Sequence, residues 1–76
     1  TLLHYSLTQD AKSVSIRIFY LAGDLVEEMA GLPTRAGDHE TAWKLDGVSA
    51  GVYIARVEAQ GHAGTAVTFV KIAVIK

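Results

Sequence analysis

The sequence contains no cysteine, so a disulfide framework and a cysteine-ligated zinc site are both excluded. Proline and tryptophan are also scarce, with one residue of each, and aromatic residues make up only 8% of the chain. Seven glycines supply residues for tight turns. Together with the single proline they stay well below the content that is typical of a disordered chain.

The chain has no excess of charge of one sign. Seven Lys and Arg residues stand against eight Asp and Glu residues, for a formal net charge of −1, and the basic residues are scattered. Nucleic-acid binding requires a basic face that neutralises phosphates, so we do not expect nucleic acid as a partner. No apolar run reaches the roughly 18 residues of a membrane helix. The longest, near Val67–Ile75, is interrupted by Thr68 and Lys71, and we expect no membrane span.

The length and the apolar content define one small domain, residues 1–76. Half of the residues are apolar, which is enough for a core in a domain that buries only about 60% of its unfolded surface. Thr1 opens directly into strand-like sequence, so we expect no signal peptide and interpret the chain as a mature piece or as a segment cut from a longer protein.

Strand signals recur at short, even spacing, and turn residues separate them. In Ser13–Tyr20, Val14, Ile16, Ile18 and Tyr20 alternate with the residues of the other face, as in a strand with one buried side. We expect the remaining strands at Leu3–Leu7, Leu25–Ala30, His39–Leu45, Val52–Gln60 and Thr65–Lys76. The intervening turns and loops are Thr8–Lys12, Ala22–Asp24, Gly31–Asp38, Asp46–Gly51 and Gly61–Gly64.

This rhythm predicts an all-β fold, an immunoglobulin/fibronectin III-like antiparallel sandwich of six to seven strands. Six strands are one fewer than in the commonest immunoglobulin-like sandwich. We expect the missing strand either before Thr1, at a truncated N-terminal edge, or inside Gly31–Asp38.

Two positions depart from simple alternation. Val26 and Met29 lie three residues apart, so a β-bulge between them is needed if both face the core. Gly23 before them suits a left-handed turn. Tyr53 follows Gly51 at a strand start. This is the arrangement of a tyrosine corner, in which the hydroxyl binds backbone upstream.

The chemistry-bearing residues do not form a site motif. The histidines His4, His39 and His62 lack the close spacing of a zinc motif, and we expect no metal and no cofactor. Asp38 and Glu40 share a face of their strand, where a solvated strand edge is the favoured interpretation. Ser49 lies in a Gly-x-Ser-x-Gly pattern at residues 47–51, but that motif needs a strand-to-helix elbow and this stretch is a turn between two expected strands. A sandwich of this size also has little concave surface. We therefore predict that the chain is not an enzyme.

Two further features have competing interpretations. Trp43, together with the tyrosines, is a candidate sugar-binding platform, but packing is the favoured role. The turn at Asp46 and Gly47 supplies too few oxygen ligands for calcium.

Several short motifs then carry a family resemblance by their order and spacing. They are Tyr5-x-Leu7, Val14-x-Ile16-x-Ile18, Gly23-x-x-Val26-x-x-Met29, Ala36-Gly37-x-His39-x-x-x-Trp43, Gly51-Val52-Tyr53 and the terminal Lys71–Lys76 with Ile72 and Val74. The sequence resembles the immunoglobulin-like domain of the flagellar hook-capping protein. It also resembles related C-terminal domains of exported bacterial proteins, including type IX secretion sorting domains. The short segment Lys44–Ala50 is more similar to the sorting and appended domains.

The resemblance implies a non-catalytic accessory module at the C-terminus of an exported bacterial protein, in the periplasm, on the cell surface or outside the cell. Its expected role is structural, or in sorting or surface attachment. Its partners would be an upstream domain of the same parent chain and the export or attachment machinery. Two alternatives stay open: a carbohydrate- or protein-binding module, and a domain of the flagellar hook cap.

Overall fold

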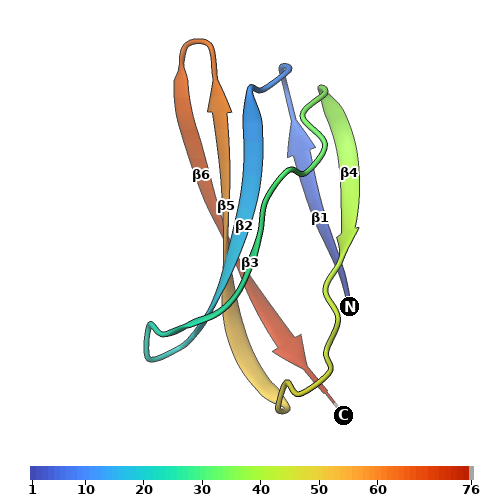
Figure 1. The fold of residues 1–76 in the computed structure, drawn as a ribbon, viewed down its shortest axis with the longest axis vertical. Coiled ribbons are helices and arrows are strands. Elements are labelled where there is room, and N and C mark those ends of the chain that lie inside the picture. The colour runs from blue at the N-terminus through green and yellow to red at the C-terminus, as the bar shows by residue number, and fades with distance from the viewer. Residues whose placement is uncertain (76) are drawn as a thin grey trace.

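The computed structural model describes residues 1–75, which form two antiparallel sheets (Figure 1). One sheet pairs β1 with β4, and the other has the strand order β3-β2-β5-β6. The strands are β1 (Leu2–Leu7), β2 (Ser13–Tyr20), β3 (Leu25–Met29), β4 (Gly37–Ala42), β5 (Gly51–Gly61) and β6 (Gly64–Val74). The predicted all-β architecture with six strands is confirmed, and the two sheets are arranged as a sandwich.

The strand β2 shows most directly how the alternation becomes structure. Val14, Ile16 and Ile18 are each 1% exposed or less, whereas Arg17 on the other face is exposed. The strand lies between β3 and β5, so its backbone is paired on both sides. Tyr20, which continues the same face, is 47% exposed because it lies at the strand end beside the turn to β3.

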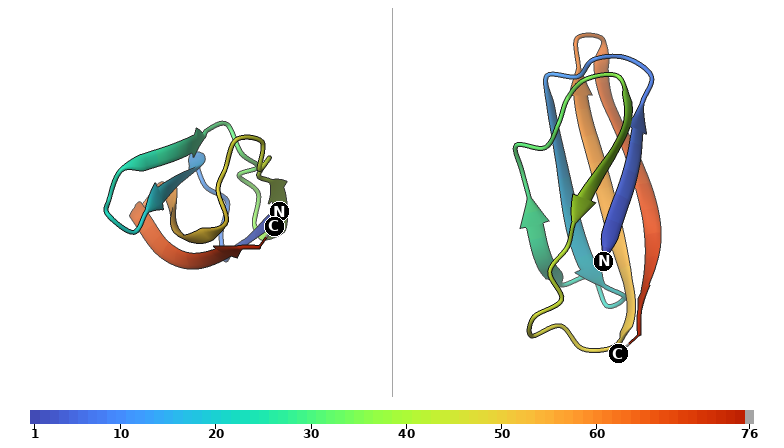
Figure 2. Two further views of the ribbon diagram at one scale, coloured as in Figure 1. Left: turned by 90° about the horizontal axis from the view of Figure 1, so that it is seen from below. Right: turned by 90° about the vertical axis from the view of Figure 1, so that its right-hand side faces the viewer.

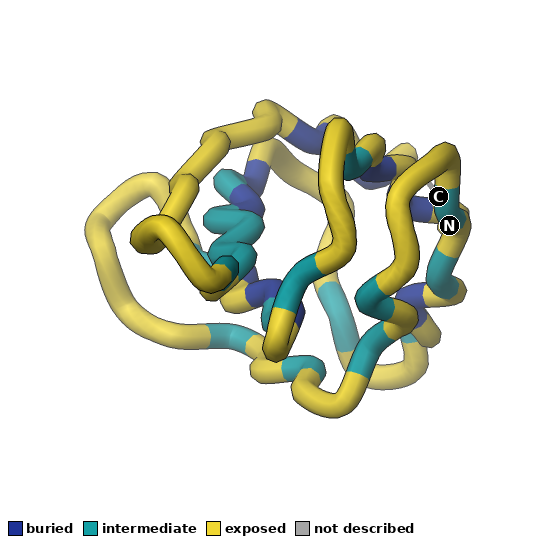
Figure 3. Tube along the Cα trace, turned by 90° about the horizontal axis from the view of Figure 1, so that it is seen from above, coloured by how far each residue is buried: buried dark blue, intermediate teal, exposed yellow. Residues whose placement is uncertain are grey.

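The core lies between the two sheets. Its buried members come from β1, β2, β5, β6 and the segment after β4. Figure 3 shows the buried stretches of the trace in dark blue. They are Leu3, Tyr5, Val14, Ile16, Ile18, Trp43, Tyr53, Ala55, Ile72 and Val74.

The predicted bounds of the fourth and the last strand are wrong. The fourth strand was expected at His39–Leu45 but spans Gly37–Ala42, so its start takes in two residues of the predicted loop and Trp43 lies just beyond its end. Pairing with β1 sets these limits, because Leu7 lies opposite Gly37 and Leu2 opposite Ala42. The last strand begins at Gly64 and ends at Val74, and Ile75 is 90% exposed. Lys76 lies outside the described residues.

A β-bulge is present, but it lies at Val26 itself and not between Val26 and Met29, so the predicted position is wrong. Ile18 lies opposite Glu27 and Phe19 opposite Leu25, so Val26 is the extra residue. From Glu27 to Met29 the pairing continues without interruption. The extra residue allows both Val26 and Met29 to pack against the core, half-buried. Gly23 in the preceding turn has φ +102°, which suits glycine.

The two sheets differ in width, and this leaves part of the inner face uncovered. In the right-hand view of Figure 2, β4 and β1 lie across the front, and β6 extends beyond β1 at the edge. The inner face of β6 is buried only near its end, at Ile72 and Val74. On the same face, Ala66, Thr68 and Val70 are exposed, because no strand lies opposite them.

Candidate functional site

Tyr53 is a buried anchor at the start of β5. Its side chain is 3% exposed, and its hydroxyl donates a 2.5 Å hydrogen bond to the carbonyl oxygen of Ser49, four residues upstream. The turn before it is closed by a hydrogen bond from the Val48 amide to the Leu45 carbonyl oxygen. The hydroxyl therefore ties the turn to the core, and the predicted tyrosine-corner contact is confirmed.

Trp43 packs against this anchor. Its ring lies edge-on to the Tyr53 ring, with centroids 5.5 Å apart and an interplanar angle of 81°. At 2% exposure the indole is not accessible to a sugar, so a carbohydrate platform built on Trp43 is wrong and the packing role is confirmed. The indole Nε1–H is buried and has no hydrogen-bond partner among the described residues.

Tyr5 is a second anchor that the sequence analysis did not identify. Its hydroxyl donates a 2.8 Å hydrogen bond to the Pro33 carbonyl oxygen, which fixes the loop between β3 and β4 against β1. Burial raises the pKa of this hydroxyl above its ordinary value, because the charged phenolate would lose water. No residue type marked this contact in the sequence, because the acceptor is a backbone carbonyl oxygen that any residue supplies.

The histidines lie apart and each has its own local setting. His4 Nδ1 lies 3.4 Å from the Glu40 carboxylate, and both side chains are largely exposed. His39 Nε2 lies 2.6 Å from the Arg35 carbonyl oxygen, and its ring lies beside Tyr5. His62 is in the β5–β6 turn. Among residues 1–75 no three His, Asp or Glu side chains form a group that could hold a metal ion.

Asp38 and Glu40 do share one face, as expected from their spacing, and this is the outer face of the β1–β4 sheet. Ser6 donates a 2.5 Å hydrogen bond to Asp38, and His4 pairs with Glu40 across the same two strands. Both pairs are exposed, so water screens the charges. The serine contacts a carboxylate and not the imidazole, so the row does not form a nucleophile with an adjacent base.

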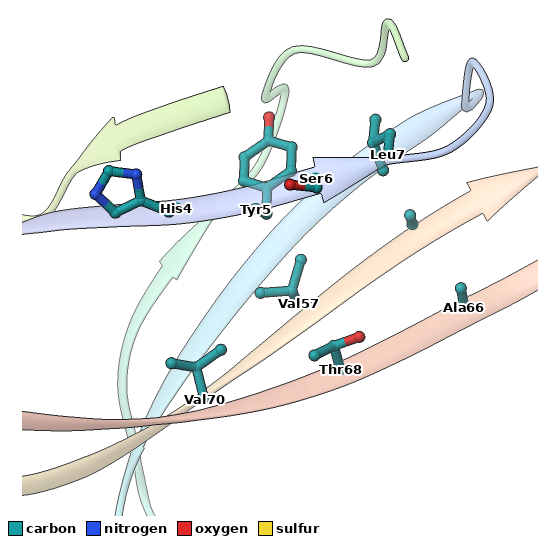
Figure 4. Close-up of a pocket in the computed structure, with 9 residues that line it drawn as sticks. His4, Tyr5, Ser6, Leu7, Val57, Ala66, Thr68 and Val70 are labelled. Carbon is teal, nitrogen blue, oxygen red and sulfur yellow. The ribbon is translucent and has the colours of Figure 1, made fainter. Parts of the chain in front are cut away.

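A hollow surface lies between β1 and β6, and we call it the β1–β6 groove. A hollow of about 380 Å³ in its middle is lined by Tyr5 and Leu7 from β1, by Val57 from β5, and by Thr68 and Val70 from β6. In Figure 4, Val57, Thr68 and Val70 point from β5 and β6 toward β1.

The groove continues in both directions along the sandwich. Toward the start of β1, a hollow of about 320 Å³ shares His4, Val57 and Val70 with the middle one. Toward the β5–β6 turn, a hollow of about 330 Å³ shares Leu7, Ala59 and Ala66 with it. The three hollows therefore form one channel that follows β1 over its length.

The residues singled out from the sequence fall into two groups. Trp43, Tyr53, Ile72 and Val74 meet in one buried cluster, and Val26 packs against it. Gly23, Gly37 and Gly51 lie in the turn before β3 and at the starts of β4 and β5. These residues build the sandwich, and none of them lines the β1–β6 groove except Ile72.

Comparison of the chain with protein-family models, with curated proteins and with solved structures found no match. Within residues 1–75, no helix is long and apolar enough to cross a membrane.

Proposed function

We propose that the chain is a non-catalytic immunoglobulin-like module of an exported bacterial protein, with a structural, sorting or surface-attachment role. The immunoglobulin-like fold is supported by the Tyr53–Ser49 hydrogen bond, because Tyr53 lies near the start of β5 and Ser49 lies in the loop before that strand. In immunoglobulin-like sandwiches a tyrosine near the start of strand F binds backbone upstream at the E–F corner.

The strand order supports the same assignment. If β5 is strand F, then β3-β2-β5-β6 corresponds to C′-C-F-G of a variable-type sheet, and β1-β4 corresponds to B-E of the opposite sheet. Strand A, which would flank β1, and strand D, which would flank β4, have no counterpart among residues 1–75.

A structural role fits the distribution of the polar groups. Arg17 pairs with Glu28, and Arg56 with Glu58, on the outer face of the four-stranded sheet. The Ser6–Asp38 and His4–Glu40 pairs lie on the outer face of the other sheet. These polar side chains therefore pair with one another on the two outer faces of the sandwich. This arrangement is expected of a structural module, in which the apolar core is the organised part.

The export and attachment part of the proposal rests on the sequence resemblance and is tested in the full-length protein. One variant lacks residues 1–76, and a second carries Lys76→Glu, which keeps Ile72 and Val74 in the core. We expect the deletion to abolish export or surface location while the activity of the remaining protein is retained. Lys76→Glu is expected to change stability by less than about 0.5 kcal/mol, so a loss of export in this variant would report recognition and not unfolding.

Normal export and location of the deletion variant would refute the sorting and attachment role. A catalytic activity that the isolated chain retains would refute the non-catalytic assignment.

A further inference from the structure

The strand β6 is an edge of the four-stranded sheet, and no strand of residues 1–75 lies on its outer side. The Lys12 amide donates a 2.6 Å hydrogen bond to the Gln60 carbonyl oxygen, so Gln60 directs its backbone groups toward β2. Its partner on β6, Thr65, therefore directs its own N–H and C=O groups away from β5. This direction alternates along an antiparallel ladder, so it is shared by Val67, Phe69, Lys71 and Ala73. We call the backbone groups of these five residues, Thr65 included, the β6 edge.

The β6 edge lacks the features that usually keep a strand edge from pairing. Natural edges are protected by short length, charged side chains, prolines or bulges. The strand β3, at the other edge of the same sheet, has five residues, a bulge and two glutamates. In contrast, β6 has eleven residues, contains no proline and carries one charged side chain, Lys71. Its pairing with β5 is regular from Gly64 to Val74, so no bulge interrupts the edge.

The strand β6 is able to pair with a second copy of itself over its whole length. Phe69 is the middle residue of Gly64–Val74. A two-fold axis through Phe69 joins the residues of the two edges as hydrogen-bonded pairs, which are Thr65 with Ala73, Val67 with Lys71, and Phe69 with its own copy. The ladder contains about ten hydrogen bonds, since each of the five residues contributes an N–H and a C=O. This is the usual number of direct hydrogen bonds in a protein–protein interface.

The side chains of β6 fit the same register. Lys71 lies opposite the apolar Val67 of the second copy, whereas an axis through Lys71 would set two lysines against each other and shorten the ladder. Phe69, which is 65% exposed, gains an aromatic neighbour across the axis. The edge is also accessible, because β6 extends beyond β1 and the two-stranded sheet does not cover it (Figure 2).

We propose that the β6 edge is the docking site for a second copy of this chain, so that the four strands of each copy form one continuous antiparallel sheet. The same surface is used on both copies, so the assembly closes at a dimer. This role goes beyond that of an accessory module and does not depend on it, since it rests on β6 and its pairing with β5.

The test is analytical ultracentrifugation of the purified chain over a range of concentrations, with one added charge at two positions. Val67→Lys sets a lysine opposite Lys71 of the second copy, and the symmetry repeats this contact. Ser15→Lys is the matched control, because Ser15 and Val67 lie on either side of Glu58 but Ser15 is on β2, away from the edge. The double variant Val67→Lys/Lys71→Glu sets opposite charges against each other across the axis. Circular dichroism melts establish that each variant is folded.

We expect the wild type and Ser15→Lys to dimerise equally. Val67→Lys should raise the dissociation constant of the dimer about five-fold, and the double variant should recover it. The decisive readout is amide hydrogen exchange of the wild type, measured by NMR below and above the dissociation constant. Exchange should slow along the β6 edge in the dimer. It should change little at Ala66, Thr68 and Val70, whose backbone groups already bond to β5.

Three results would overturn the proposal. The first is a chain that sediments as a monomer at every concentration, including those used for NMR. The second is a dimer that Ser15→Lys weakens as much as Val67→Lys, which would assign the contact to the outer face around Glu58. The third is slow exchange along the β6 edge in the monomer, in this chain or in the full-length protein, which would mean that the edge is already paired within one chain.

Discussion

Tyr53→Phe removes one hydroxyl from the core and leaves the ring in place. In the wild type this hydroxyl donates to the Ser49 carbonyl oxygen, and the ring remains edge-on to Trp43 in the variant. A net hydrogen bond contributes about 0.5–1.5 kcal/mol, and an acceptor left unsatisfied costs about 1–3 kcal/mol. Ser49 is exposed, so water replaces part of the lost contact. We therefore expect a loss of about 1–2 kcal/mol in the free energy of unfolding.

The measurement is urea denaturation followed by circular dichroism, with Trp43 fluorescence as a second probe of the same transition. In a domain of this size 1 kcal/mol corresponds to about 4–8 °C in Tm, so thermal melts resolve the effect. Tyr20→Phe is the matched control, because Tyr20 is 47% exposed and lies beside the Tyr53 ring. A Tyr53→Phe midpoint equal to that of the wild type would refute the structural role of the hydroxyl.

The remaining predictions concern the core, the burial of Tyr5 and metal independence. Trp43→Ala should lower the free energy of unfolding by about 3–5 kcal/mol. Trp43→Phe should lower it distinctly less, because it also removes the unpartnered Nε1–H. Equal denaturation midpoints for the two variants would contradict this. Deletion of residues 72–76 should abolish cooperative thermal unfolding, because Ile72 and Val74 contribute about 1.5–3 kcal/mol each to a total of about 5 kcal/mol, while exposed Ile75 adds little. The pKa of Tyr5 is raised in the folded state, so the neutral hydroxyl contributes to the free energy of unfolding below pH about 10. This contribution is lost as the pH rises through the folded-state pKa. In alkaline melts Tyr5→Phe should therefore lose less stability than the wild type. Melts with and without a chelator should coincide, and a fall of several degrees on chelation would require a bound ion.

The sequence by itself determined the strands whose alternation is unbroken and whose turns are marked by glycine. Val14, Ile16 and Ile18 follow one another at period two, so their common burial needs no knowledge of the partner strands. The β5–β6 hairpin is similar, because Gly61 and Gly64 bracket a two-residue turn. The presence of a bulge was also predictable, since two apolar residues three apart cannot otherwise share a face, but its place at Val26 was not.

Only the tertiary structure decided where pairing stops and which apolar residues are covered. The limits of β4 follow from the length of β1 opposite it, a long-range fact that local residue types do not encode. Val70 and Ile72 occupy equivalent places in the alternation of β6, yet one is 40% exposed and the other 8%. Burial requires a strand on the opposite side as well as an apolar side chain, and the two-stranded sheet covers only part of the face. The β1–β6 groove is therefore a property of the packing, and no motif in the sequence marks it.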